Sequence, residues 1–378
     1  MNKLKKFSNL ICFALSGALF SSLVYCYWHF AAKPHESLNF DALQSLMSSV
    51  QIEVENDKHP ENYAKACALM DANSGELLLS KNADEKLPMA STTKIMTAII
   101  VLENCALDET VTITKESQGV EGSSIYLLAG ETLSVHELLY GLMLESGNDA
   151  ATALAIHTAG NIEDFCRLMN KKASDLGLSS TNFENPHGLS SQNHFTTAKE
   201  LAIIASYAMK NEHFRQLVST EKYVISEREN CRGRYFSNHN RLLKSYDICD
   251  GIKTGYTKNS GRCLVTSTSI GESRFVVVTL DDRNDWNDHK ELHEFAANNF
   301  ESVRLANKDE LNFVIPDTNE NLIATNKDAI YITRKKGKNT PFDLTIELGK
   351  GNFASGEIAG YMRINDDENC FLFPLVVR

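Results

Sequence analysis

The pattern of apolar and polar positions divides the chain into a mixed region of strands and helices, followed by a region of short strands. Residues 66–70 and 77–80 are strand-like and flank Asn73-Ser74-Gly75, a sequence typical of a hairpin turn. After Ser91, apolar residues at mixed spacings of three and four predict a helix that is buried in the core. Further helices are predicted over 133–143, 149–157, 201–209 and 288–300.

Strand-like sequence returns after residue 250. The three runs cover 252–256, 263–268 and 275–280, and Gly271-Glu272-Ser273 supplies the turn between the last two. Strands therefore open and close this region, and helices fill its middle. This order predicts an α/β (α+β) fold, in which helices cover one antiparallel sheet whose first and last strands are neighbours.

The main folded region is expected over residues 61–300, and residues 301–310 are predicted to be a hinge. Residues 311–378 are predicted to form a small all-β domain, because short strand-like runs alternate there with turn residues. The expected strands are 311–315, 322–325, 329–334, 342–347, 357–365 and 370–377.

Residues 1–32 differ in character from the rest of the chain. Three lysines among residues 3–6 precede an apolar stretch, from Phe7 to about Ala32, which no charge interrupts. A basic start followed by an apolar core is typical of an export signal, and this one is long enough to span a bilayer. An uncleaved membrane anchor is favoured over a cleaved signal peptide, because no clean cleavage site follows. The lysines place the remainder outside the cytoplasm, with residues 33–60 as a stalk.

Composition excludes some classes of protein. The net charge of -11 argues against a nucleic-acid partner, because phosphate binding needs a basic face. The nine cysteines include no Cys-x-x-Cys pair, which excludes a zinc ribbon and a thioredoxin-like site. Buried free thiols are expected, with a Cys231–Cys249 disulfide left open. His289 and His293 lack the glutamate that follows the first histidine in zinc peptidases, so they are expected to be core residues.

Ser91-Thr92-Thr93-Lys94 carries candidate catalytic chemistry. A helix that begins near Ser91 places Lys94 on the same face, one turn further on. A serine hydroxyl needs a base to become a nucleophile, and a lysine serves if burial or nearby charge lowers its pKa. The N-terminal end of a helix also directs backbone N–H groups toward developing negative charge. Ser219-Thr220-Glu221-Lys222 has the same spacing, but no partner motifs follow it in the required order.

Two further motifs follow. Ser146-Gly147-Asn148 lies between two predicted helices, where a tight loop can project both polar side chains, although a helix stop with an asparagine cap also explains it. Lys253-Thr254-Gly255 lies in a predicted strand, whose edge offers backbone hydrogen bonds to an extended peptide. Lys253 adds charge for a carboxylate and Gly255 permits close approach, although an exposed lysine on a hairpin is the alternative.

The order of the three motifs, with spacings of 55 residues (91 to 146) and 107 residues (146 to 253), favours the functional interpretation. The same three motifs occur in penicillin-binding proteins and class A β-lactamases. Over about residues 64–300 the chain resembles the low-molecular-mass penicillin-binding proteins, the serine D-Ala-D-Ala carboxypeptidase family. The resemblance extends to the flanking text: LPMASTTKIMTA, LLYGLMLESGNDAATALA, TNFENPHGL and DGIKTGYTKNSGRCLV.

The resemblance implies a penicillin-binding/β-lactamase-like catalytic domain over 61–300. It also implies removal of the terminal D-alanine from peptidoglycan stem peptides that end in D-Ala-D-Ala, with β-lactams as covalent inhibitors and no metal or cofactor. Ser91 would attack the carbonyl between the two D-alanines, and Lys94 would take its proton. Backbone N–H groups of Ser91 and Tyr256 would form the oxyanion hole, and Ser146 would relay a proton to the leaving amine.

The resemblance also assigns substrate-binding roles. Asn148 would contact the substrate backbone, while Lys253 and Thr254 would hold the terminal carboxylate on the strand that continues through Gly255 and Tyr256. Some family members attach to the membrane by a C-terminal amphipathic helix. Here the C-terminal end contains Pro374 and is predicted to be a strand, so membrane attachment is expected through the N-terminal segment.

Three alternatives are weighed against this hypothesis. A class A β-lactamase needs a Glu-x-x-Leu-Asn segment between Asn148 and Lys253, and the nearest acidic loop, Glu184-Asn185-Pro186-His187, fits the carboxypeptidase flank instead. A D,D-endopeptidase of the same fold has the same motifs and stays open. A non-enzymatic β-lactam-sensing or peptidoglycan-binding module would keep the groove and lose the chemistry, whereas Ser91 and Lys94 are both intact here.

Overall fold

The computed structural model describes residues 60–378 apart from 317–321, 338–341, 352 and 366–369. The expected export segment, and all but the last residue of the expected stalk, lie outside the described residues. Within the described part, no helix combines the length and the apolar character needed to cross a bilayer.

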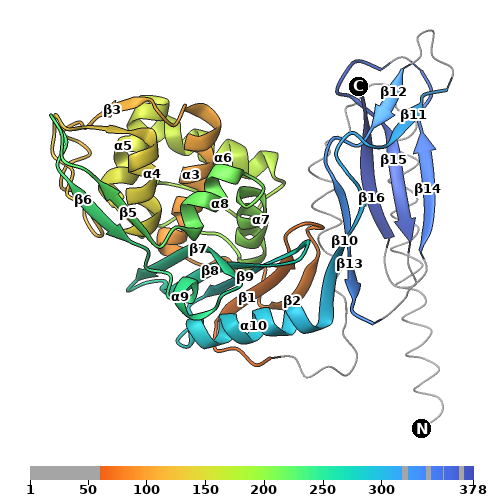
Figure 1. The fold of residues 1–378 in the computed structure, drawn as a ribbon, viewed down its shortest axis with the longest axis horizontal. Coiled ribbons are helices and arrows are strands. Elements are labelled where there is room, and N and C mark those ends of the chain that lie inside the picture. Colours follow the sequence, from red (N-terminus) through yellow and green to blue (C-terminus); the bar gives the residue numbers. More distant parts are fainter. Residues whose placement is uncertain (1–59, 317–321, 338–341, 352, 366–369) are drawn as a thin grey trace. The chain divides into compact units, whose positions relative to one another are not determined.

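A five-stranded antiparallel sheet forms the centre of the larger region (Figure 1). Its strand order is β2 (Leu77–Lys81), β1 (Ala66–Asp71), β9 (Ser273–Leu280), β8 (Gly261–Ile270) and β7 (Cys249–Thr257). The first strand, β1, therefore pairs with β9, the last strand of this sheet in the sequence, as the order of strands in the sequence predicted. This pairing leaves β7, the strand that carries Lys-Thr-Gly, at one edge of the sheet.

Both faces of the sheet are buried against helices. Because successive side chains of a strand point to opposite faces, one strand contributes residues to both cores. On β1, Ala68 and Met70 pack into the large helical core, whereas Cys67 and Leu69 pack into a second, smaller core. The smaller core is covered by α10 (Asp285–Asn299), which lies on the opposite side of the sheet from the helical cluster (Figure 1). Sequence alternation and burial thus agree with a three-layer arrangement.

The helical cluster comprises more elements than the sequence pattern indicated. Its helices are α3 (Lys94–Asn104), α4 (Val135–Leu144), α5 (Asn148–Ala159), α6 (Ile162–Asp175), α7 (Ala198–Ala208) and α8 (Glu212–Ser219). The sequence analysis missed α6 and α8, although both begin at an asparagine cap, Asn161 and Asn211. Short elements complete this region: β3 (Thr110–Thr112), β4 (Thr132–Ser134), β5 (Lys222–Ile225), β6 (Arg234–Ser237) and α9 (Leu242–Ser245).

The two histidines of α10 are core residues, as predicted. The hydroxyl of Thr266 lies 2.6 Å from Nδ1 of His289 and 2.7 Å from Nε2 of His293. Thr279 contacts the other nitrogen of His289, and Thr268 contacts the other nitrogen of His293, both at 2.9 Å. Burial lowers the pKa of His293 to about 3 and lowers that of His289 well below its usual value, so both rings are neutral.

Part of the predicted hinge is a strand. β10 (Phe300–Ala306) follows α10 directly and pairs antiparallel with β13 (Ile330–Lys335), so the hinge prediction is wrong over residues 301–306. Phe300, Ser302 and Ala306 are buried while Glu301 and Arg304 are exposed, and the antiparallel pairing with β13 holds the segment as a strand.

The remaining C-terminal strands form a second antiparallel sheet and match the predicted runs. They are β11 (Asn312–Val314), β12 (Ile323–Thr325), β14 (Asp343–Leu348), β15 (Ile358–Asn365) and β16 (Cys370–Val377). Their order in the sheet is β11-β12-β16-β15-β14. β16 contains Pro374 and is a strand rather than an amphipathic helix, as the sequence indicated. The cysteines of the described residues are all free, so the conceivable Cys231–Cys249 disulfide does not form.

Candidate active site

Ser91 lies in a 3-10 turn, Ala90–Thr93, which leads directly into α3 at Lys94. Hydroxyl groups on either side of the turn hold it: Thr92 donates to the carbonyl of Met89 at 2.6 Å, and Thr93 donates to the carbonyl of Ala90 at 2.8 Å. The sequence analysis expected an α-helix to begin near Ser91. The structure differs by one tighter turn, which still places Ser91 and Lys94 on the same side.

Lys94 is fully buried, and its amine has three polar contacts. Nζ lies 3.0 Å from the hydroxyl of Ser91, 2.7 Å from Oδ1 of Asn148 and 2.6 Å from the carbonyl oxygen of His187. The amide and carbonyl oxygens are acceptors only, so each must receive an N–H of the lysine. Only the serine hydroxyl can donate, so a neutral amine with two N–H groups would direct its lone pair at the hydrogen of Ser91.

The electrostatic surroundings favour that neutral form. Burial is the largest cause that lowers the pKa of Lys94 well below its usual value, and the charge of Lys253 lowers it further. The carboxylate of Asp149 acts in the opposite direction. The amine of Lys94 thus lies within hydrogen-bond reach of the Ser91 hydroxyl, and its surroundings lower its pKa.

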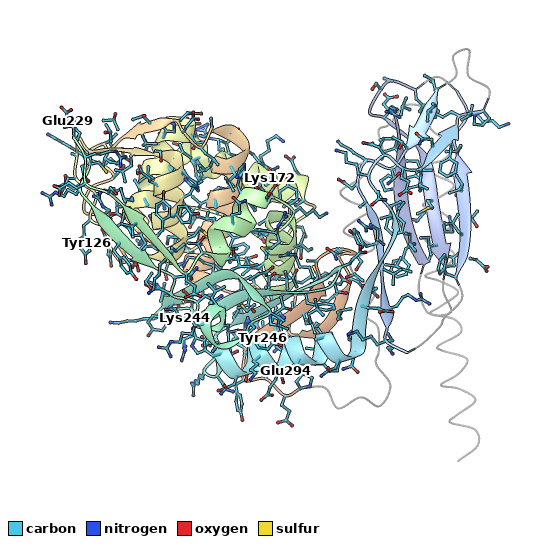
Figure 2. The ribbon with its side chains drawn as sticks, viewed as in Figure 1. Tyr126, Lys172, Glu229, Lys244, Tyr246 and Glu294 are labelled. Atoms are coloured by element: carbon cyan, nitrogen blue, oxygen red, sulfur yellow. The ribbon has the colours of Figure 1, made fainter. Side chains whose placement is uncertain are left out.

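Asn148, at the start of α5, orients the lysine. Its Oδ1 accepts from Lys94, while its Nδ2 donates to the carbonyl of Glu121 at 2.5 Å. The next residue, Asp149, is buried and fixes the segment 121–127 beside the site: its carboxylate accepts from the backbone N–H groups of Ile125 and Leu127. Tyr126 of this segment is exposed (Figure 2). Sequence analysis missed Asp149, although it directly follows the Ser-Gly-Asn motif.

Ser146 occupies the loop between α4 and α5 in a left-handed backbone conformation, with φ of 61°. The residue is 5% exposed, and its hydroxyl has no hydrogen-bond partner among the described residues. A buried polar group without a partner is destabilising, so it marks a position where a bound molecule can supply one. The helix-stop alternative for this motif explains the loop but not this unpaired hydroxyl.

The Lys-Thr-Gly strand lies directly against the serine. A Cβ atom added at Gly255 would lie 3.0 Å from the backbone nitrogen of Ser91, closer than an ordinary van der Waals contact, so the close packing of β7 against the turn favours glycine. Thr254 is half-buried, and Tyr256 next to Gly255 is exposed. Because β7 is an edge strand, β8 pairs with only one of its sides, and the other side can hydrogen-bond an extended peptide.

Lys253 is buried, with 2% of its surface exposed, rather than exposed on a hairpin. Its amine donates to the carbonyl of Thr254 at 3.1 Å. Burial lowers the pKa of Lys253 to about 7, while the carboxylate of Glu145 acts in the opposite direction. At neutral pH this amine therefore exchanges between its charged and neutral forms, and a carboxylate bound beside it would favour the charged form.

Glu145, just before the Ser-Gly-Asn motif, connects that loop to the region of β7. Its carboxylate accepts from the backbone N–H of Ser237 at 2.7 Å and lies 3.4 Å from Nε2 of His239. Asn240, next to His239, donates to the carbonyl of Gly251 on β7 at 2.9 Å. Sequence analysis named none of these residues. Only Glu145 carried a signal, its position next to the motif.

A histidine fixes the turn that carries Ser91. The backbone N–H of Glu184 donates to Nδ1 of His194 at 3.0 Å, so the hydrogen of this neutral ring must be on Nε2. Nε2 lies 2.7 Å from the hydroxyl of Thr93, which in turn donates to the carbonyl of Ala90. Burial lowers the pKa of His194 to about 4, which keeps the ring neutral. The chain of hydrogen bonds ends on the residue before Ser91.

The second Ser-x-x-Lys sequence forms no comparable site. Ser219 is the last residue of α8, is exposed, and donates to the carbonyl of Gln216. Lys222 begins β5 and is exposed. The structure thus brings Ser91, Lys94, Ser146, Asn148 and the Lys253–Tyr256 strand together, and leaves the competing motif on the surface.

The geometry places a serine hydroxyl 3.0 Å from the amine of a buried lysine. A family model described as D-alanyl-D-alanine carboxypeptidase matches residues 53–284. The chain belongs to this family of serine peptidases.

Individual relatives agree with this assignment. D-alanyl-D-alanine carboxypeptidase DacF of Bacillus subtilis is 38% identical over 224 residues, which are 57% of this chain and 57% of the relative. DacC of Escherichia coli is 36% identical over 65% of this chain and 64% of its own length, so the chain spans less than two thirds of these two relatives. DacA of Haemophilus influenzae is 32% identical over 80% of this chain and 79% of the relative.

Two solved structures are similar to the fold. Penicillin-binding protein 5 from Haemophilus influenzae superposes with a TM-score of 0.71 at 28% identity, over 85% of this chain and 98% of that one. A mutant of the Streptomyces K15 DD-transpeptidase superposes with a TM-score of 0.60 at 33% identity, over 63% of this chain and 99% of that one. The first likeness reaches into the C-terminal β region, and both include the penicillin-binding-type region with its antiparallel sheet and helical cluster.

Proposed function

We propose that this chain is a penicillin-sensitive, serine-type D-alanyl-D-alanine carboxypeptidase that removes the terminal D-alanine from peptidoglycan stem pentapeptides. The observation that carries the proposal is the buried amine of Lys94, which lies 3.0 Å from the hydroxyl of Ser91 while two acceptor-only oxygens hold its N–H groups. Relatives that bear the name D-alanyl-D-alanine carboxypeptidase support the choice of reaction.

In the proposed acylation step, Lys94 accepts the hydroxyl proton while Oγ of Ser91 bonds to the carbonyl carbon between the two D-alanines. Backbone N–H groups of Ser91 and Tyr256 stabilise the negative charge on the carbonyl oxygen. The C–N bond then breaks, and the proton passes through the hydroxyl of Ser146 to the leaving amine. The buried, unpaired state of that hydroxyl supports this role, because it has no protein hydrogen bond to give up.

Substrate binding is proposed along β7. An extended peptide would pair with the free edge of the strand, and its terminal carboxylate would lie beside Lys253 and Thr254. The burial of Lys253 supports this assignment, because a buried amine gains more from a partner of opposite charge than an exposed one does. Asn148 is proposed to contact the substrate backbone in addition to orienting Lys94. Water would then hydrolyse the acyl-enzyme, and β-lactams would acylate the same serine.

The site is proposed to act outside the cytoplasm, where peptidoglycan is found. Residues 1–32 provide the sequence support for export, as a membrane anchor or a cleaved signal peptide. A chain that retains this segment would attach to the membrane through it, with the catalytic region on the outer side.

The experiment that tests the proposal measures release of free D-alanine from a stem pentapeptide by the full chain, beside Ser91→Ala. The duplicated motif supplies a matched control, because Ser219 is a serine of the same local sequence pattern that is exposed on the surface. We expect full release by the wild type and by Ser219→Ala, and none by Ser91→Ala. Labelling of Ser91 by a fluorescent penicillin without release of D-alanine would instead indicate an endopeptidase or a β-lactam sensor.

A further inference from the structure

Three side chains with metal-binding atoms converge where α3 and α5 end. Cys105 caps the C-terminal end of α3, His157 lies in the last turn of α5, and Glu109 lies just before β3. Their sulfur, nitrogen and oxygen atoms all lie within 4.8 Å of one another, and Nε2 of His157 is 2.9 Å from Oε2 of Glu109. Among the described residues, no other set of three such side chains comes this close.

The protein already orients each of these groups. The other carboxylate oxygen of Glu109 accepts from the backbone N–H of Ala106 at 2.5 Å, which directs Oε2 toward the histidine. The hydroxyl of Thr158 donates to the carbonyl of Leu154, so at its 3.3 Å contact with Cys105 the thiol must be the donor. A carboxylate held by a backbone N–H is typical of a metal ligand whose orientation is set by its surroundings.

The chemical types of the three ligand atoms indicate which metal ion they would bind. Thiolate, imidazole and carboxylate are ligands that Zn²⁺ accepts at about 2.0–2.3 Å, whereas Mg²⁺ and Ca²⁺ require oxygen ligands throughout. Ligand atoms of a tetrahedral zinc lie roughly 3.2–3.8 Å apart, so the three atoms reach the ion by shifts of about 1 Å or less. The thiolate and the carboxylate together neutralise the double charge, and a water molecule completes four-fold coordination.

We propose that Cys105, Glu109 and His157 form a zinc-binding site that fastens the C-terminal ends of α3 and α5 together. Lys94 and Asn148 lie at the opposite ends of the same two helices, about 15 Å away for a helix of 11 residues. Zinc therefore stabilises the scaffold of the helical cluster and takes no part in the reaction. The proposal is independent of the proposed function.

Zinc binding releases protons from the ligand atoms. The Cys105 thiol loses its proton to solvent and a sulfur–zinc bond forms. The hydrogen that Nε2 of His157 donates to Glu109 leaves that nitrogen, for Nδ1 or for solvent, so that Nε2 and the Glu109 carboxylate can supply the other two protein ligands. Burial raises the pKa of the Cys105 thiol, so the free protein holds this proton at neutral pH. Zinc affinity should therefore increase as pH rises.

The test uses the full chain after dialysis against a chelator, with Zn²⁺ titrated in competition with a chromophoric chelator. We expect one ion per chain, and a loss of affinity of about 100-fold or more for Cys105→Ser and for His157→Gln. Cobalt supplies a second readout, because a thiolate ligand produces a charge-transfer absorption band that Cys105→Ser should abolish. Zinc should also raise the unfolding temperature of the wild type and leave those of the two variants unchanged.

Cys370→Ser is the matched control, because Cys370 is a free, exposed thiol on β16. It should bind zinc as the wild type does, and penicillin should acylate all four proteins at the same rate without zinc. The unfolding temperatures of the metal-free proteins show whether each variant is folded. The proposal is wrong if zinc binding survives both Cys105→Ser and His157→Gln, if Cys370→Ser abolishes it, or if the folded wild type binds no zinc.

Discussion

Two regions of this protein that bury polar groups differ in how completely those groups are paired. Beneath α10, the α10 cluster (Thr266, Thr268, Thr279, His289 and His293) has a hydroxyl partner for every ring nitrogen. Around Ser91, the hydroxyl of Ser146 has no partner among the described residues, and the buried amine of Lys253 contacts one carbonyl. Complete pairing is typical of a stabilising core, whereas incomplete pairing keeps groups available for a ligand.

The comparison also shows that burial alone does not identify a catalytic group. Burial lowers the pKa of His293 and of Lys94 alike. The neutral histidine has its two nitrogens occupied by threonine hydroxyls, so it is inert. The amine of Lys94 instead contacts two acceptor-only oxygens and one hydroxyl that can donate a hydrogen, that of Ser91. The hydrogen-bond partners of a buried group, rather than its lowered pKa, therefore distinguish a structural residue from a candidate catalytic one.

The largest expected effect is that of removing the base. Lys94→Ala should lower the rate of Ser91 acylation by about 10²–10⁴-fold, because a positioned general base contributes that much. The rate is measured with a fluorescent penicillin under single-turnover conditions. Lys222→Ala, in the exposed second motif, is the control and should react at the wild-type rate. A similar rate for Lys94→Ala would show that another group activates the serine.

Breaking the α10 cluster should affect stability instead of reaction rate. Thr266→Val keeps the shape of the side chain but leaves a buried nitrogen of His289 and one of His293 without a partner, at a cost of about 1–3 kcal/mol for each. Urea unfolding should therefore show a loss of about 2–6 kcal/mol. The rate of acylation per folded molecule should not change. Thr345→Val, at an exposed strand position, should stay within about 0.5 kcal/mol of the wild type.

The same cluster predicts a loss of stability in acid. The pKa of His293 is about 3 in the folded protein, whereas in the unfolded chain it is near 6.5. As pH falls below about 6.5 the unfolded chain takes up a proton that the folded protein excludes, so folding becomes less favourable until pH passes the folded value. His293→Gln should reduce the slope of unfolding free energy against pH by up to about 1.4 kcal/mol per unit between pH 6 and 5. An unchanged slope would mean that this ring is protonated when folded.

The smallest expected effect concerns the carboxylate site. Glu145→Gln keeps an oxygen for the backbone N–H of Ser237 but removes the negative charge that raises the pKa of Lys253. Lys253 should then lose its proton at a lower pH, so KM for a peptide with a free terminal carboxylate should increase a few-fold near pH 7. The kcat should change little, and the increase in KM should diminish as pH falls further below 7, because Lys253 then gains its proton in both proteins. A lower kcat at every pH would indicate a distorted loop instead.

The sequence predicted the sheet, its closing hairpin and the three motifs because each depends on local patterns or on residues that the reaction needs. It missed α6, whose buried residues Phe165, Cys166, Met169 and Ala173 are interspersed with many charges. It also placed a hinge where β10 pairs with β13, since the partner of a strand cannot be read from the strand itself.

Within the site, the sequence could name the reacting groups but not those that orient them. His194 acts through Thr93, and the two lie 101 positions apart in the chain. His239 reaches Glu145 from the segment after β6. Such contacts form only when the chain folds. A single histidine has no local sequence pattern from which these contacts could be predicted. Asp149 is different, because its position after Asn148 could have been noticed.

We propose that the amine of Lys94 is neutral at neutral pH and accepts the proton of Ser91. The most direct measurement is a pH titration of the lysine side chains by NMR in protein labelled with ¹³C-lysine, with Lys94→Arg used to assign the Lys94 signal. We expect this signal to have the shift of a neutral amine already at pH 7 and to titrate far below the usual lysine pKa of about 10.4. A signal that titrates near or above about 10.4 would contradict this proposal.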